Sequence, residues 1–132
     1  MKIVIFCLVI PLVFAGCSPA GSAGNTAAVN TLTTYLQAFV DKNEARMSSL
    51  ICKDWTNDAL LEYDAFQGVK TRLEGLSCQV SGNENETVLV NCQGKILATY
   101  QNEVQQFDLS KRIYRLQKAG ADYQVCGYRD KP

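Results

Sequence analysis

Residues 88–100 read Val-Leu-Val-Asn-Cys-Gln-Gly-Lys-Ile-Leu-Ala-Thr-Tyr, and every second side chain in this run is apolar or small. A period of two is typical of a β-strand that packs one face on a core. Gly94 in the middle predicts a bend or a bulge, because glycine weakens a regular strand. The opposite face is polar apart from Leu89 and Leu97, which we expect to lie singly on an exposed surface.

The same period continues on both sides of this strand. Residues 76–81 alternate before a turn at 82–86, and residues 104–117 form a strand after a turn at 101–103. A last strand is expected at 122–129, after a turn that contains glycine. These runs predict a four-stranded antiparallel meander.

Three helices are expected ahead of the sheet. Apolar side chains recur at helical spacing over 27–40, and Asn43 is placed to cap a second helix. Asp54 can cap a third helix, which carries several aromatic side chains and stops at Gly68. Helices followed by strands indicate an α+β fold, with three N-terminal helices packed on one face of a curved four-stranded antiparallel sheet.

The N-terminal residues have a different character. Lys2 precedes an uncharged apolar run, Ile3–Ala15, which as a helix would span only about 20 Å of a hydrocarbon core of ~30 Å. Such a run is typical of a secretory signal peptide rather than of a membrane span. Its end, Val-Phe-Ala-Gly-Cys at 13–17, resembles the lipobox of bacterial lipoproteins.

This resemblance implies that the sulfur of Cys17 receives a diacylglyceryl group and that Cys17 becomes the mature N-terminus. The lipid would then hold the chain on the extracytoplasmic side of a membrane of the cell envelope. On this basis residues 1–16 are the signal peptide, and 17–26 are the lipidated cysteine with a flexible linker of small residues. The folded domain is expected at 27–132.

Composition limits the function. The chain has 13 lysines and arginines, 13 aspartates and glutamates and a net charge of zero, so we expect no nucleic-acid partner. The one basic cluster, Lys111, Arg112, Arg115 and Lys118, is expected to be a solvated surface. There is no histidine, which removes the commonest general base and zinc ligand. We therefore expect no metal and no cofactor.

Four cysteines follow Cys17 in the sequence. An even number in an exported chain favours two disulfides. Cys78 and Cys92 share the inward phase of neighbouring strands, so we favour a bond between them. That choice leaves Cys52 with Cys126, and the other two connectivities stay open.

The order of elements, the stretch Tyr-Leu-Gln-Ala-Phe at 35–39 and the long bent strands resemble the nuclear transport factor 2-like superfamily, a cone-shaped, cystatin-like α+β fold. The resemblance covers about residues 26–130. It implies a cone whose open end often forms an apolar pocket. The residues expected to line that pocket are Tyr35, Phe39, Trp55, Tyr63 and Tyr100. The alternative is that these aromatic side chains simply fill the core.

Three functions are compatible with the sequence. We favour a non-catalytic, membrane-anchored module that binds a small apolar ligand or an envelope protein. The second is a small isomerase or dehydratase, since relatives of the fold transfer protons with a buried carboxylate and a tyrosine; the candidates are Asp64 and Asp108 with Tyr35 or Tyr100. The third is a structural or inhibitory protein that uses the two leucines of the outer sheet face.

The size and the lining of the cone interior distinguish among these three functions. A ligand binder needs a cavity of at least ~300 Å³. An enzyme of this kind needs a buried carboxylate within hydrogen-bond reach of a tyrosine at the mouth of a cavity. An interaction protein needs a filled core and an exposed apolar patch.

Overall fold

The computed structural model describes residues 20–132, so the expected signal peptide and Cys17 lie outside the described residues. In this part of the chain no helix is long and apolar enough to cross a membrane. The elements in chain order are helix α1 (Ala20–Val40), helix α2 (Glu44–Ser48), a 3₁₀ turn η1 (Lys53–Trp55), helix α3 (Thr56–Ala65), strand β1 (Lys70–Glu84), strand β2 (Thr87–Tyr100), strand β3 (Glu103–Asp108), a second 3₁₀ turn η2 (Leu109–Lys111), strand β4 (Arg112–Ala119) and strand β5 (Asp122–Asp130).

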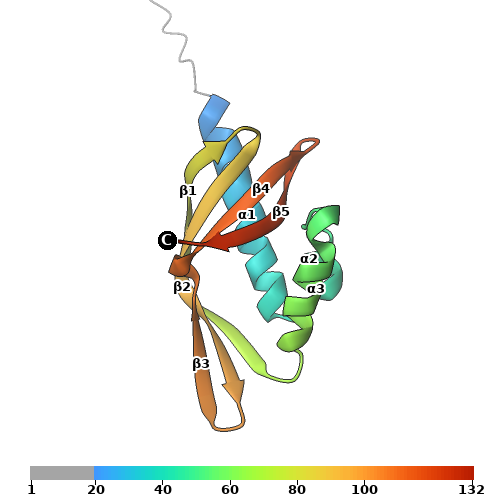
Figure 1. Cartoon of the computed structure of the whole chain (residues 1–132), viewed down its shortest axis with the longest axis vertical. Coiled ribbons are helices and arrows are strands. Elements are labelled where there is room, and N and C mark those ends of the chain that lie inside the picture. The colour runs from blue at the N-terminus through green and yellow to red at the C-terminus, as the bar shows by residue number, and fades with distance from the viewer. Residues whose placement is uncertain (1–19) are drawn as a thin grey trace, which may run out of the picture.

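Strand β2 organises the sheet because it has three partners. β1 pairs antiparallel with it along almost its whole length. On the other side, β4 pairs with residues 87–91 and β3 with residues 95–100 of β2. β5 pairs with β4, which gives the order β1-β2-β4-β5 with β3 beside β2. The β2–β3 hairpin extends from the body at the end opposite the start of α1 (Figure 1).

The change of partner on β2 coincides with the bend predicted at Gly94. This residue has φ 104°, and a Cβ placed on it would lie 2.6 Å from the carbonyl oxygen of Glu74 on β1. The register between the two strands shifts at the same place, between Glu74 and Ser77. Any side chain at Gly94 would push the strands apart, so glycine fixes both the bend and the bulge.

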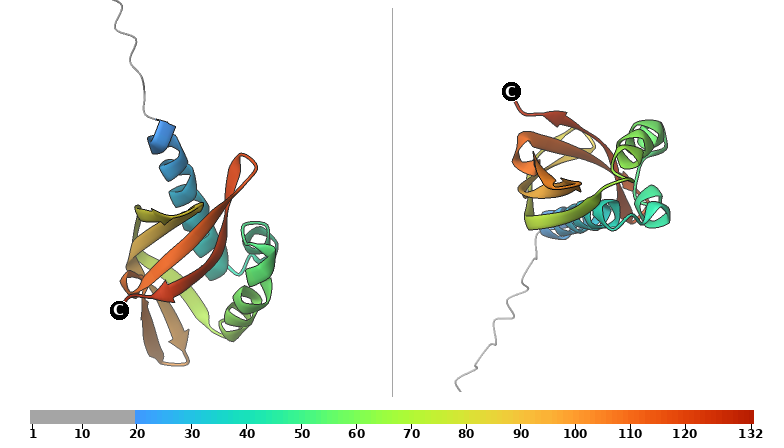
Figure 2. Two further views of the ribbon diagram at one scale, coloured as in Figure 1. Left: turned by 45° about the horizontal axis from the view of Figure 1, so that its top comes forward. Right: turned by 90° about the horizontal axis from the view of Figure 1, so that it is seen from below.

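Helix α1 crosses the sheet and contacts β1, β2, β4 and β5. Views from two further directions show α2 and α3 standing beside it rather than over the middle of the sheet (Figure 2). The buried stripe of α1 includes Leu32, Leu36 and Phe39, which share one core with inward side chains of β2 such as Val90 and Ile96. The expected α+β fold with one antiparallel sheet is confirmed.

A short bridge ties the helical layer to the last strand. Ile51 pairs in parallel with Val125 of β5. The backbone N–H of Cys52 donates to the carbonyl of Val125 at 2.9 Å, and the N–H of Val125 donates to the carbonyl of Leu50 at 2.8 Å. The disulfide between Cys52 and Cys126 lies directly beside this bridge, with Cα atoms 4.9 Å apart. The covalent bond and the bridge therefore hold the same two segments together.

The second disulfide joins Cys78 to Cys92. The two residues are directly opposite each other in the β1–β2 register, with Cα atoms 4.0 Å apart. The structure thus contains the connectivity that the strand phases favoured.

Helix α1 begins at Ala20, seven residues before its expected start, so residues 20–26 of the expected flexible linker are helical. Glycine lowers helix propensity in this stretch. A tertiary contact offsets that cost, because a Cβ placed on Gly24 would lie 3.2 Å from the hydroxyl of Tyr123 on β5. The side chain of Tyr123 therefore reaches the first turns of α1.

The sheet has five strands rather than four, because the run expected as one strand is interrupted by η2. Asp108 caps this turn by accepting a hydrogen bond from the N–H of Ser110 at 2.9 Å. Leu109 is buried within the turn. The turn explains why apolar side chains change phase along 104–117, which no uninterrupted strand allows.

Two further boundaries differ from expectation. β1 begins at Lys70, six residues early, and the hydroxyl of Thr71 donates to the carbonyl of Val40 at 2.8 Å, which holds this first part beside the end of α1. α3 begins at Thr56, so Asp54 lies in η1 instead of capping α3.

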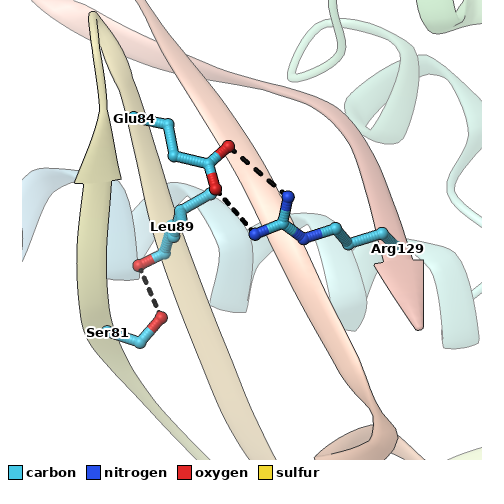
Figure 3. Close-up of polar contacts among 4 residues, drawn as sticks. All are labelled: Ser81, Glu84, Leu89 and Arg129. Carbon is cyan, nitrogen blue, oxygen red and sulfur yellow. Dashed lines mark hydrogen bonds and ion pairs between the residues drawn. The ribbon is translucent and has the colours of Figure 1, made fainter. Parts of the chain in front are cut away.

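The outer face of the sheet buries the two leucines that were expected to be exposed. Leu89 is 8% exposed and Leu97 is 5% exposed. Arg129 reaches from β5 to Glu84 on β1 in an ion pair of 2.7 Å, which lies over this face beside Leu89 (Figure 3). Leu97 stands opposite Arg72, a long side chain whose aliphatic part can cover it. The expectation of an exposed leucine surface is therefore wrong.

Candidate functional site

A polar cluster lies where α3 meets the start of β4. The guanidinium of Arg112 donates from Nη1 to Oε1 of Glu62 on α3 at 2.9 Å. The two side chains are 23% and 22% exposed, so water screens this ion pair only in part. The expectation that Arg112 is solvated is thus wrong, whereas Lys111, Arg115 and Lys118 are exposed as expected.

Tyr128 on β5 completes the surroundings of the ion pair. Its hydroxyl donates to Oε1 of Glu62 at 3.3 Å. The Cζ atom of Arg112 lies 3.9 Å from the centre of the Tyr128 ring, which is cation–π geometry. Trp55 packs edge-on against the same ring, with centroids 6.2 Å apart. Arg112 is therefore fixed by a carboxylate and by an aromatic face.

Two buried tyrosines, Tyr35 of α1 and Tyr114 of β4, border the same cluster. Burial, reinforced by the charge of Glu62, raises the pKa of Tyr35 well above its usual value. Burial raises the pKa of Tyr114 to about 12, although the charge of Arg112 opposes it. Burial and Glu62 also raise the pKa of Tyr128. All three phenols stay protonated near neutral pH, so they can donate hydrogen bonds but cannot act as bases.

The space enclosed by these groups is small. A cavity of about 10 Å³ is lined by Tyr35, Leu36, Phe39, Glu62, Ile96, Arg112 and Tyr114. It has room for about one water molecule, far below the ~300 Å³ of small ligand pockets. Within residues 20–132, no three cysteine, aspartate or glutamate side chains come close enough together to hold a metal ion.

The structure brings together four of the five aromatic residues expected to line a pocket. Ring centroids of Tyr35 lie 6.3 Å from Phe39 and 5.7 Å from Trp55, and Phe39 lies 6.0 Å from Tyr63. Tyr35, Phe39 and Tyr63 are buried in the core, where Tyr35 and Phe39 border the small cavity, whereas Trp55 is half-buried and borders a surface groove of about 350 Å³. Tyr100 lies apart from them, in the β2–β3 hairpin, where it borders a surface groove of about 520 Å³.

Neither carboxylate expected for catalysis belongs to the cluster. Asp64 is exposed on α3. Asp108 is exposed and caps η2, and hydrogen bonds from Ser110 lower its pKa. The sequence analysis missed Glu62, although this residue follows the buried Ala59 by three positions and therefore lies on the apolar face of α3.

Solved structures of other proteins share the fold of this chain. Aln2 from a Streptomyces species superposes with a TM-score of 0.56 and 9% sequence identity, over 85% of this chain and 90% of its own. A candidate dehydratase of the NTF2-like family from Streptomyces avermitilis superposes with a TM-score of 0.54 and 12% identity, over 83% and 95% of the two chains. This chain has the NTF2-like fold. No family model and no curated protein matches its sequence.

The NTF2-like domain of this chain therefore shares its backbone arrangement with these proteins. Sequence identities of 9% and 12% support a shared fold, but they do not assign the roles of residues in those proteins to residues of this chain. The roles of Glu62, Arg112 and the tyrosines follow from their own geometry.

Glu62→Gln removes a charge from the ion pair and leaves the guanidinium of Arg112 half-buried without its counterion. We expect this change to lower the free energy of unfolding by about 1–3 kcal/mol, less than for a fully buried pair because both side chains reach water. Urea denaturation at pH 7 measures the loss. Asp64→Asn, two residues along α3 and exposed, is the matched control and should change stability by less than about 0.5 kcal/mol. Equal effects of the two substitutions would contradict the role of the pair.

Tyr114→Phe removes a buried hydroxyl that lies beside the Arg112 guanidinium without a hydrogen bond of good geometry among the described residues, so at pH 7 it should change stability by less than about 1 kcal/mol. At alkaline pH the two proteins should diverge. The pKa of Tyr114 is raised in the folded state, so folding favours the protonated hydroxyl. This contribution to the free energy of unfolding is fully present below about pH 10 and is lost as the pH rises through about 12.

Between these pH values the free energy of unfolding of the wild type should fall by about 2–3 kcal/mol more than that of Tyr114→Phe. Thermal denaturation across this range measures the difference. Tyr100→Phe, in the exposed hairpin, is the control. Parallel alkaline curves for wild type and Tyr114→Phe would show that the hydroxyl is hydrated.

Proposed function

We propose that the chain is an exported lipoprotein, anchored through Cys17, whose NTF2-like domain binds a protein of the cell envelope without catalysing a reaction. The lipobox-like sequence at 13–17 supports the anchor. The two disulfides support an oxidising compartment, since such bonds persist outside the cytoplasm.

The small size of the interior is the observation that favours a protein-binding module over an enzyme or a binder of small ligands. A cavity of about 10 Å³ leaves no room for a substrate or for a small apolar ligand. Recognition would therefore take place on the outer surface, where the grooves of about 430 and 520 Å³ are lined mainly by polar side chains, unlike the pockets that hold small apolar ligands. This reasoning favours an envelope protein over a small ligand.

The second candidate is a proton-transferring enzyme of the isomerase or dehydratase class. One observation favours it: Glu62 lies within hydrogen-bond reach of Tyr128 at the edge of a cavity. Against it, Oε1 of Glu62 already accepts hydrogen bonds from Arg112 and from Tyr128, so this oxygen is engaged within the protein. Catalysis would also need the aromatic cluster to open.

Cys17→Ser should move the chain from the membrane fraction to the soluble fraction and abolish its acyl mass, because serine has no thiol to carry the diacylglyceryl group that holds the chain on the membrane. Fractionation and intact-mass measurement of the purified protein check both results. Cys7→Ser, inside the expected signal peptide, is the matched control and should leave anchoring intact. A Cys17→Ser chain that still carries lipid would contradict the anchor.

The filled interior can be tested with benzene, which enters dry cavities of suitable size. Wild type should show no benzene-dependent rise in melting temperature. Phe39→Ala removes a ring that packs on Tyr35, Tyr63 and Phe66, so it should cost about 3–5 kcal/mol and create a cavity that benzene fills. Benzene should then stabilise the variant alone. Stabilisation of the wild type would reveal an interior pocket and would favour the ligand-binding or enzymatic alternatives.

A further inference from the structure

The first turns of α1 belong to the rigid body of the domain. The Tyr123 side chain extends from β5 to the first turns of α1, since a Cβ placed on Gly24 would lie 3.2 Å from its hydroxyl. α1 then continues to Val40 without interruption and contacts four strands of the sheet. The start of this helix consequently has a fixed direction relative to the sheet, which a flexible linker would not give it.

The start of α1 lies at the same end of the molecule as two hairpin turns. These are the β1–β2 turn around Asn85 and the β4–β5 turn around Gly120 (Figures 1 and 2). We call this the anchor end and define it by residues 84–87 and 118–123. The β2–β3 hairpin lies at the opposite end.

Cys17 is three residues before Ala20, the first residue of α1. Three residues of chain reach at most about 11 Å, even when fully extended. A lipid on Cys17 would therefore keep the start of α1 within that distance of the bilayer surface. Because α1 is packed on the sheet, the direction of this helix relative to the membrane also sets the orientation of the rest of the domain.

We propose that the domain sits on the membrane in one orientation, with the anchor end against the phospholipid surface and the β2–β3 hairpin pointing away from it. This inference rests on the proposed lipidation of Cys17. It identifies the bilayer itself as the partner of the anchor end.

The chemistry of the anchor end suits such a position. The tip of the β4–β5 turn carries only Ala119, Gly120 and Ala121, which are exposed and small enough to approach the headgroups. Next to it, Lys118 and Tyr123 line a groove of about 430 Å³. Lysine and tyrosine are side-chain types that place an apolar body and a polar tip at a membrane interface. The exposed acidic residues Glu84, Glu86 and Asp122 outnumber Lys118 at the anchor end, so the lipid on Cys17, rather than charge attraction, would supply the attachment.

The orientation also determines which surface of the domain is accessible to a partner protein. The far end presents Val104, which is 51% exposed, together with the groove beside Tyr100. Both would face the space beyond the membrane surface.

Energy transfer from tryptophan to lipid headgroups tests the orientation. The full lipidated chain is placed in phosphatidylcholine vesicles that contain a lipid with a dansyl headgroup. Ala121→Trp marks the anchor end and Val104→Trp marks the far end, while wild type, with Trp55 alone, gives the background of both. Since α1 alone is about 30 Å long, we expect transfer from Ala121→Trp to be several-fold higher than transfer from Val104→Trp.

A second variant separates orientation from mere attachment. Inserting about ten Gly and Ser residues between Pro19 and Ala20 adds a coil with an end-to-end distance of roughly 17 Å. It should keep the chain on the vesicles and shrink the difference between the two tryptophan positions. Equal transfer from both positions without the insertion would overturn the fixed orientation, and higher transfer from Val104→Trp would reverse it. A chain that carries no acyl mass and does not stay on the vesicles would overturn the anchor itself and the orientation with it.

Discussion

The close approach of β1 to β2 at Gly94 determines the shape of the molecule. Only hydrogen can occupy the position of a Cβ there, because the carbonyl oxygen of Glu74 lies 2.6 Å away. The resulting bend lets one strand pair with β4 over its first part and with β3 over its last part. One consequence is a sheet that curves around α1, and another is a β2–β3 hairpin that leaves the body.

The curved sheet encloses a core that is almost completely filled. Aromatic rings from α1, η1 and α3 meet near the centre, and the space left among them is about 10 Å³. The polar residues at the edge of this core neutralise one another: Arg112 binds Glu62, and Tyr128 contacts both. Such an arrangement stabilises a defined junction between α3 and the last two strands. It leaves the carboxylate little freedom for acid–base chemistry.

Much of the fold could be predicted because burial imposes a period on the sequence. The alternation along 88–100 indicated the central strand, and the shared phase of Cys78 and Cys92 indicated their cross-strand pairing. The five strands were counted as four because η2 is a local turn held by Asp108, and a short turn leaves no period of its own. The helical start at Ala20 was missed because a tertiary contact with Tyr123 overrides the low helix propensity of the stretch.

The candidate site was harder to predict than the fold. Its members lie on separate elements, with 50 residues between Glu62 and Arg112, and no spacing rule links them. The position of Glu62 on the apolar face of α3 was the one available signal. Arg112 looked like a member of a solvated cluster because its neighbours in the sequence are indeed solvated.

The two disulfides differ in how much of the chain must exist before each can form. Cys78 and Cys92 are 14 residues apart in one hairpin, so they can be oxidised as soon as that hairpin pairs. Cys52 and Cys126 are 74 residues apart, and the second of them lies close to the C-terminus. In the export that we propose, Cys126 would enter the oxidising compartment last, after the other three cysteines of the domain have been available for wrong partners. The Cys52–Cys126 disulfide can therefore form only after almost the whole domain has entered that compartment. Correct pairing at that step is favoured when Cys78 and Cys92 are already joined, because their thiols can then no longer react with Cys52 or Cys126.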